Sequence, residues 1–245
     1  MVSEQVKVKV LGTGTAIPSL KRGSSSYLVS VEKCNILVDV GPSVVRRLLE
    51  HGYTVDDVDA VFLTHFHVDH TADLSTFLFA CNYGLKQRTK PLIVAGGQGI
   101  HKFYAGLSKI YPWILPKSYE FRLHGVPGGE LKIGNVLART ARVNHNRESI
   151  GVRLEKEKSL VFSGDTDYST NLIKLAHGAD LLIAECSFPE RKVKGHLNLN
   201  ILEKIVKKSQ PKRVLISHLY PEWEGFRGIL HAPYLMAEDG MEIEF

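Results

Sequence analysis

The sequence predicts an α/β protein in which two β-sheets pack face to face and carry helices on their outer sides, a four-layer αββα sandwich. Runs of short strands are followed by strand–helix alternation, and this order occurs twice along the 245 residues without a linker. No sequence repeat, low-complexity tract or charge block divides the chain. We therefore expect residues 1–245 to form a single domain built from two similar halves.

Segments of the first half that are β-branched or alternate in polarity lie between turns that carry glycine, serine and asparagine, a pattern typical of strands. The predicted strands are Val6–Leu11, Ser26–Val31, Asn35–Val40, Ala60–Thr64 and Pro91–Ala95. Pro42 suits the first turn of a helix and Gly52 suits its end. The predicted helices are Pro42–His51, Ala72–Lys86 and Gly99–Leu107, and the connector Ile110–Pro116 follows them.

The second half has the same rhythm, with several strands before the first helix. The predicted strands are Tyr119–Leu123, Val136–Val143, Ile150–Leu154, Ser159–Ser163, Leu181–Glu185 and Arg213–Ser217. Helices are expected at Thr170–His177 and Asn198–Lys208, and a short C-terminal piece at Met241–Phe245.

Composition excludes several classes of protein. A formal net charge of +5 suits an anionic substrate but is too small to indicate a nucleic-acid-binding protein by itself. No apolar run reaches the ~18 residues that a membrane span needs, and the alternating first ten residues continue into a strand, so we expect no signal or transit peptide. Cys34, Cys81 and Cys186 form no CxxC pair, which argues against a disulfide framework and favours a reducing cytoplasm.

The segment Thr64–His70 reads THFHVDH and directly follows an apolar strand. Three imidazoles and a carboxylate within six positions need polar partners, so a merely solvated loop is disfavoured. On an extended backbone, His65 and His67 can converge on one ion, and Asp69 and His70 can serve a second. Imidazole and carboxylate ligands suit zinc, manganese or iron.

HxHxDH after a hydrophobic strand resembles the signature of the metallo-β-lactamase superfamily, and the rest of the chain resembles its ribonuclease Z branch. Further segments that resemble family motifs follow in order: Leu37–Gly41, His145, Ser163–Thr166, Ala184–Phe188, Gly195–His196, Ser217–His218 and residues 237–244. Two of them depart from the branch, which reads His-Glu-Ala-Thr where this chain has Ala184–Ser187, and His-Ser-Thr where it has His196–Asn198.

The resemblance implies two divalent metal ions, with Zn²⁺ as the first choice and Mn²⁺ or Fe²⁺ as alternatives. The implied ligands of one ion are His65, His67 and His145, those of the other are Asp69, His70 and His218, and Asp165 bridges them. Asp39 ends an apolar strand and is expected to orient a ligand histidine or the HxHxDH loop; a plain turn aspartate beside Gly41 is the alternative.

The resemblance also places His196 over the substrate, as the acid that protonates the leaving oxygen. Glu185 is expected to hold that imidazole in its tautomer, and Asp69 to orient the attacking water. Lys21, Arg22 and Ser24 follow a loop rich in small residues and could grip a phosphate, with an ordinary hairpin turn as the alternative. The remaining histidines are taken as structural or surface groups: His51, His101, His124, His177 and His231.

These features predict a metal-dependent hydrolase, a phosphodiesterase acting on small, cyclic or nucleotide phosphodiesters. Asp165 follows His145 by only 20 residues, which leaves no room for the long arm that transfer-RNA-processing members of the branch carry there. The alternatives are a ribonuclease Z acting on transfer-RNA 3′ trailers, a lactonase, thioesterase or lactamase, and a non-enzymatic binding module. The expected partner is a phosphodiester, as nucleotide or RNA, and no membrane; a homodimer is left open.

Overall fold

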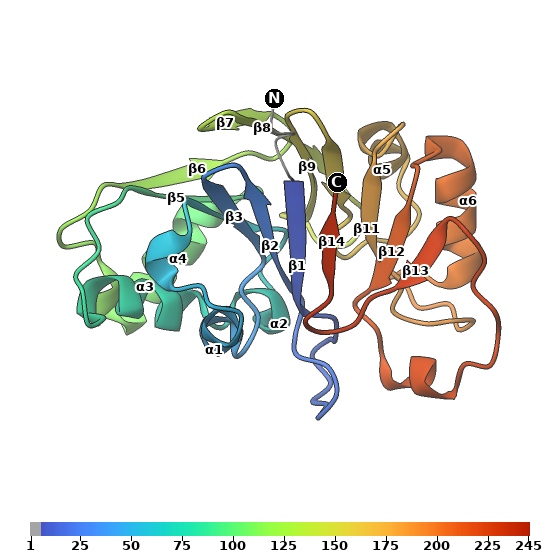
Figure 1. The fold of residues 1–245 in the computed structure, drawn as a ribbon, viewed down its shortest axis with the longest axis horizontal. Helices are drawn as coiled ribbons and strands as arrows, with labels where there is room; N and C mark the ends of the chain where they lie inside the picture. The colour runs from blue at the N-terminus through green and yellow to red at the C-terminus, as the bar shows by residue number, and fades with distance from the viewer. Residues whose placement is uncertain (1–5) are drawn as a thin grey trace.

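The computed structural model describes residues 6–245 and has two mixed β-sheets facing each other at its centre (Figure 1). Residues 1–5, which the sequence-based expectation of no signal or transit peptide includes, lie outside the described residues. The strand order of one sheet is β14-β1-β2-β3-β4-β5-β6, and that of the other is β13-β12-β11-β10-β9-β8-β7. Each sheet thus collects one half of the chain, apart from β14, which pairs with β1 in the first sheet.

The first sheet changes from antiparallel to parallel at β3. Its strands are β1 (Val6–Gly12), β2 (Ser26–Val31), β3 (Cys34–Val38), β4 (Ala60–Leu63), β5 (Leu92–Gly96), β6 (Phe121–Gly125) and β14 (Glu242–Glu244). The pairs between β14, β1, β2 and β3 are antiparallel, and those between β3, β4, β5 and β6 are parallel.

The second sheet makes the same change at β10. Its strands are β7 (Glu130–Ile133), β8 (Val136–Arg142), β9 (Ile150–Glu155), β10 (Ser159–Phe162), β11 (Leu181–Glu185), β12 (Val214–Ser217) and β13 (Tyr234–Met236). The pairs from β7 to β10 are antiparallel and those from β10 to β13 are parallel. The two halves therefore share a topology, as the repeated rhythm of the sequence predicts.

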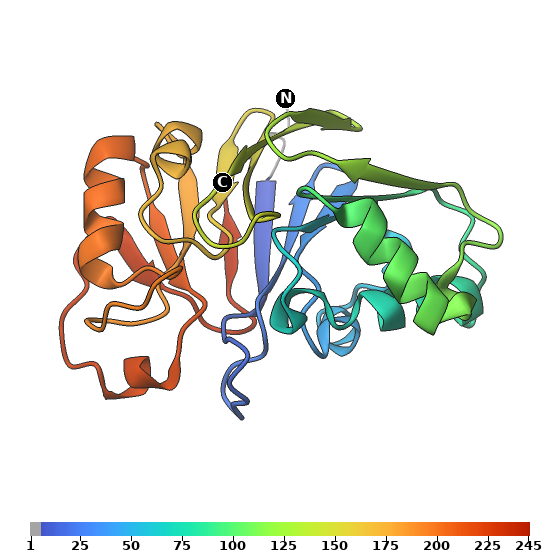
Figure 2. The ribbon, with the colours of Figure 1, turned by 180° about the vertical axis from the view of Figure 1, so that it is seen from behind.

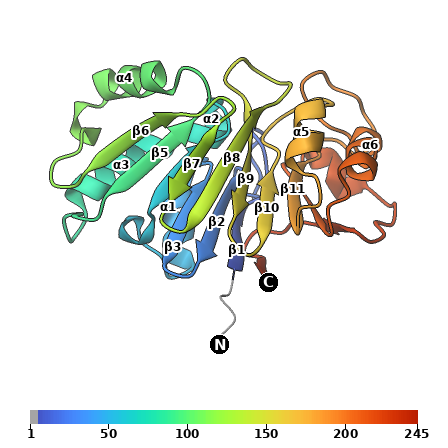
Figure 3. The ribbon, with the colours of Figure 1, turned by 90° about the horizontal axis from the view of Figure 1, so that it is seen from above.

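Helices cover the outer face of each sheet, which confirms the four-layer sandwich (Figure 3). Beside the first sheet lie α1 (Val44–Glu50), α2 (Val68–Thr71), α3 (Leu74–Tyr83) and α4 (Ile100–Ile110). Beside the second lie α5 (Thr170–Leu175) and α6 (Leu199–Ser209). Seen from behind, α4 and α6 lie on opposite outer sides (Figure 2). Short 3₁₀ turns occupy Val55–Asp57, Pro112–Ile114 and Pro221–Gly225.

Three apolar layers hold the sandwich together. Valines of β1 and β2, together with Phe62, Phe162 and Ile183, fill the space between the sheets. The other two layers lie between each sheet and its helices, and contain Leu48, Phe77 and their neighbours on one side and Leu202 and its neighbours on the other. Because burial of apolar surface is the main favourable term in folding, these layers fix where the strand ends lie.

The structure differs from the sequence-based expectations in four places. The strand expected at Tyr119–Leu123 as the start of the second half is β6 (Phe121–Gly125), which pairs with β5 in the first sheet. The helix predicted at Ala72–Lys86 is two helices, α2 and α3, and ends at Tyr83 because Gly84 leaves the helical conformation. Strands β7 and β13 were not predicted, because they are short: β7 has four residues, most of them at least partly exposed, and β13 has three. No helix in residues 6–245 is long and apolar enough to cross a bilayer.

Candidate metal centre

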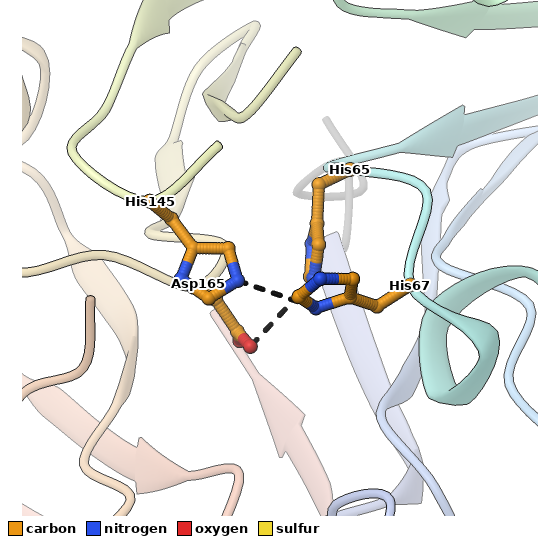
Figure 4. Close-up of side chains that lie close together, drawn as sticks. All are labelled: His65, His67, His145 and Asp165. Atoms are coloured by element: carbon orange, nitrogen blue, oxygen red, sulfur yellow. Dashed lines mark hydrogen bonds and ion pairs between the residues drawn. The ribbon is translucent and has the colours of Figure 1, made fainter. Parts of the chain in front are cut away.

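The candidate ligands follow the carboxyl ends of strands from both sheets. His65 and His67 lie in the loop after β4, Asp165 follows β10 by three residues, and His218 directly follows β12. His145 lies in the loop after β8. Parallel strands of one sheet end at the same edge, and ligands commonly bind there in α/β folds. Figure 4 shows how His65, His67, His145 and Asp165 approach one another from these separate loops.

The ligand atoms form two groups that meet at Asp165. In the first group, the donor atoms of His65, His67, His145 and Asp165 all lie within 4.8 Å of one another; Asp69, His70 and His218 form the second in the same way. The Asp165 carboxylate also lies 3.5 Å from His70 Nε2 and 3.5 Å from His218 Nε2. Atoms that bind one tetrahedral zinc ion at 2.0–2.1 Å are ~3.4 Å apart. The observed spacings therefore fit ligands that share a cation.

Three buried polar atoms in this cluster have no hydrogen-bond partner: His65 Nε2, His70 Nε2 and Asp165 Oδ1. An unpaired buried polar atom costs free energy, and native structures rarely leave three together. All three belong to the two ligand groups. The residues present thus fit a bound metal ion, which would satisfy each of these atoms.

Four carboxylates are buried around the cluster. Asp39, Asp69, Asp165 and Glu185 are 2%, 7%, 2% and 4% exposed, respectively. Within the described residues, the ion pairs recorded for Asp39, Asp69, Asp165 and Glu185 are all with histidines, and none with lysine or arginine. Buried charges need compensation. The charge balance of the site therefore favours cations.

These charges shift the pKa values of the site residues. Burial raises the pKa of Asp165, but the imidazoles of His218 and His70 outweigh it and hold that pKa well below its usual range. Burial lowers the pKa of His70, but Asp165 and Asp39 raise it overall, to about 10. Burial and the neighbouring His70 hold the pKa of His65 far below its usual value. Without a metal ion, a proton on His70 thus offsets part of the negative charge of the buried carboxylates.

Asp39 orients two of the candidate ligands. Its Oδ2 atom lies 2.7 Å from Nδ1 of His70 and accepts the hydroxyl of Thr64 at 2.8 Å, and that hydroxyl lies 3.1 Å from Nδ1 of His65. Asp39 itself has a left-handed backbone, with φ of 60°. Both imidazoles thus turn Nε2 toward Asp165. The structure places Asp39 where an orienting group is expected.

His67 and His145 are oriented by different partners. The side-chain amide of Asn146 lies 3.0 Å from His67 Nε2, which leaves His67 Nδ1 facing His145 Nε2 at 3.3 Å. The Nδ1–H of His145 donates to the carbonyl of Gly195 at 2.8 Å. Gly195 has a φ of 86°, and a Cβ there would lie 2.9 Å from His145 Nδ1. Only glycine allows this close approach.

Glu185 connects the remaining histidines. Its Oε1 atom lies 3.2 Å from Nδ1 of His196 and accepts the backbone N–H of Thr166 at 2.7 Å. Its Oε2 atom accepts the hydroxyl of Ser187 at 2.7 Å, and that hydroxyl lies 3.0 Å from Nδ1 of His218. His196 also lies within ligand distance of Asp165 and His218. The structure thus brings His196 and Glu185 together beside the ligand groups.

The predicted phosphate-binding loop faces other protein groups. Lys21 and Arg22 both pair with Glu224, and Arg22 also donates to Thr13 and to the carbonyl of Ala237. Ser24 packs beside Gly41. No phosphate contact is shown by this arrangement, and the role of Lys21, Arg22 and Ser24 in substrate binding stays a prediction.

Four groups that position the ligands were not singled out from the sequence: Thr64, Asn146, Ser187 and the carbonyl of Gly195. Each lies in, or directly beside, a segment that resembles a family motif. Proximity to a motif was therefore the one sequence signal that could have identified these groups. Their roles depend on contacts between segments far apart in the chain, such as 50 residues between His145 and Gly195.

Chelation should destabilise the protein. A ligand present at a thousandfold its Kd adds about 4 kcal/mol to stability, so saturating Zn²⁺ or Mn²⁺ should raise Tm by roughly 10 °C over the value in EDTA. His65→Ala should remove most of this rise. His51→Ala is the matched control, because His51 Nε2 is also buried without a partner but lies outside both ligand groups. Equal Tm values in EDTA and in metal would contradict a metal centre.

Known proteins are similar to this chain in sequence and fold. The family model described as "Anti-Pycsar protein Apyc1" matches residues 6–233. The probable metallo-hydrolase YhfI of Bacillus subtilis is 27% identical over 224 residues, which are 87% of each chain. The crystal structure of YhfI superimposes on this chain with a TM-score of 0.82 at 24% identity, and the superposition covers 99% of this chain and 100% of that chain. A ribonuclease Z of Mycolicibacterium gilvum is 30% identical over 198 residues, 73% of this chain and 68% of that enzyme. The short form of human tRNase Z shares the fold, with a TM-score of 0.79 at 22% identity over 97% of this chain and 98% of that chain. The chain therefore belongs to the anti-Pycsar protein Apyc1 family, among the metallo-hydrolases of the metallo-β-lactamase fold that are related to ribonuclease Z.

Proposed function

We propose that this protein is a phosphodiesterase that hydrolyses small, cyclic or nucleotide phosphodiesters with the help of two divalent metal ions. The observation that carries the proposal is the His196–Glu185 pair, 3.2 Å apart, at the edge of the two ligand groups. Hydrolysis of a diester expels an alcohol, which needs a proton, and an imidazole held by a carboxylate can supply one. The relatives named ribonuclease Z, whose RNA substrates are phosphodiesters, support the same chemistry.

In this proposal His65, His67 and His145 hold one ion, Asp69, His70 and His218 hold the other, and Asp165 lies between them. When bound, the two ions would lower the pKa of a water molecule and stabilise charge on a phosphoryl oxygen. Zn²⁺ is the ion we favour, because imidazole and carboxylate ligands suit it, as they also suit Mn²⁺ and Fe²⁺.

The protein's own groups then handle the substrate and the protons. Asp69 orients the attacking water, whose oxygen bonds to phosphorus as the bond to the leaving oxygen breaks. Burial lowers the pKa of His196, but the hydrogen bond to Glu185 together with the negative charges of Glu185 and Asp165 raises this pKa overall, which favours the protonated acid. Nδ1 of His196 faces Glu185, so Nε2 is the atom that gives its proton to the leaving oxygen.

A groove of about 740 Å³ opens outward from His145 and suits an anionic substrate. Its walls carry three cations, Arg142, Arg147 and Lys194, against one carboxylate, Asp167. None of the three has a recorded carboxylate partner within the described residues, and Arg147 bonds to the neutral side chain of Gln98. We propose that this groove receives the part of the substrate beyond the scissile phosphate.

A lactonase or thioesterase could use the same metal ions on a carbon substrate. We expect such an enzyme not to depend on the His196–Glu185 pair; a thioesterase in particular expels a thiolate, which needs no proton. The pair therefore favours the phosphodiester, and the dependence on leaving group tests the choice.

Replacing His196 should separate binding from chemistry. His196→Ala should keep its metal content but lose ~10²–10⁴ in kcat on diesters with a poor alkoxide leaving group. Activated aryl diesters should be affected much less, because their leaving group needs little protonation. The control is His177→Ala, an exposed histidine remote from the site. Equal losses on both kinds of diester would refute the acid role, and a loss of metal would make His196 a ligand.

Precursor transfer RNA should be a poor substrate. In the described residues, the stretch between His145 and Asp165 holds the hairpin of β9 and β10 and no protruding arm. A large RNA needs many phosphate contacts, and their affinity falls steeply with salt. We expect clear turnover of a cyclic mononucleotide or an aryl diester and weak trailer removal from a precursor at ~150 mM salt, measured as kcat/KM. Efficient and accurate trailer cleavage under those conditions would instead support the ribonuclease Z alternative.

A further inference from the structure

The hydroxyl of Ser187 lies between one of the buried carboxylates and a candidate metal ligand. Ser187 is fully buried at 0% exposure. Its Oγ atom is 2.7 Å from Glu185 Oε2, 3.0 Å from His218 Nδ1 and 3.2 Å from His196 Nδ1. Ser187 therefore connects Glu185, which holds the predicted acid His196, to the candidate metal ligand His218.

The proton count of these groups sets the direction of each hydrogen bond. A serine hydroxyl has one proton to donate, and an ionised carboxylate can only accept. The short contact to Glu185 takes the Ser187 proton, so Ser187 can only accept from His218. In the neutral imidazole that metal binding requires, the single proton of His218 would thereby be fixed on Nδ1, and Nε2, which faces Asp69 and Asp165 at 3.4 and 3.5 Å, would be the atom left for a metal ion.

The first half of the chain has the same arrangement. There Asp39 holds His70 directly and reaches His65 through the hydroxyl of Thr64. In the second half Glu185 contacts His196 directly and reaches His218 through Ser187. Each half thus supplies one buried carboxylate that controls two imidazoles, one of them through a hydroxyl.

We propose that Ser187 is a positioning residue that fixes the tautomer of His218 for metal binding and ties this ligand to the carboxylate that holds His196. The inference rests on the proposed function, because it takes His218 as a ligand and His196 as the acid. Groups that orient ligand imidazoles typically change metal affinity 10- to 100-fold when they are removed.

The test compares Ser187→Ala with Ser187→Thr, which keeps the hydroxyl. Titration of the metal-free protein with Zn²⁺ should show that Ser187→Ala lowers the affinity for one of the two ions by about 10- to 100-fold and leaves the affinity for the other within about threefold of wild type. Ser187→Thr should restore the lowered affinity. Ser209→Ala is the matched control, because Ser209 is equally buried and its hydroxyl donates, within residues 6–245, to the carbonyl of Ile205 in α6.

Activity gives a second readout. The Glu185–His196 contact does not pass through Ser187, so at saturating Zn²⁺ the Ser187→Ala protein should regain most of its kcat. Its preference for activated over poor leaving groups should stay that of the wild type, whereas Glu185→Gln should alter both metal affinity and this preference. If Ser187→Ala folds poorly, the isosteric pair Ser187→Thr and Ser187→Val replaces it, since these two differ only in the hydroxyl.

Wild-type affinity for both ions in Ser187→Ala, or failure of Ser187→Thr to restore the weakened ion, would overturn the proposal. Metal titration uses no substrate, so its result is independent of whether the enzyme hydrolyses phosphodiesters. Absence of phosphodiesterase activity with a selective loss of one ion would refute the proposed function and leave the role of Ser187 intact.

Discussion

The structure depends on the burial of four carboxylates at one edge of two packed sheets. Asp39, Asp69, Asp165 and Glu185 have almost no contact with solvent, and the charged side chains beside them are imidazoles. Such a concentration of negative charge is costly unless cations enter or histidines take up protons. The raised pKa of His70 means that, in the metal-free chain, a proton on this histidine offsets part of the negative charge. Bound metal ions would offset the rest.

The duplicated topology explains how one chain can build this site. Each sheet changes from antiparallel to parallel pairing, and the parallel strands end where the ligands begin. The first half contributes the HxHxDH loop, oriented by Asp39, and the second contributes Asp165 and His218, with Glu185 behind. Because the two sheets pack through a continuous apolar layer, the loops of both halves are held against one another. The candidate metal centre thus lies at the junction of the two halves.

Local patterns in the sequence predicted most of the fold and the candidate ligands of the HxHxDH segment, whereas the family resemblance implied His145, Asp165 and His218. Apolar strands such as β4 and β11 carry their own signal, and the HxHxDH segment is unusual enough to stand out alone. Other features arise only from tertiary contacts. Ser187 and Asn146 are ordinary polar residues until folding brings them to His218 and His67. The edge strand β13 and the break between α2 and α3 escaped prediction because neighbouring elements, and not local propensity, determine them.

The most direct test of the account is a crystal structure with anomalous diffraction at the absorption edge of the bound metal. The account predicts two peaks, one surrounded by His65, His67 and His145 and the other by Asp69, His70 and His218, with Asp165 contacting both. It further predicts that His196 contacts neither ion and keeps its hydrogen bond to Glu185. A single peak, or a peak bound by His196 in place of His218, would contradict it.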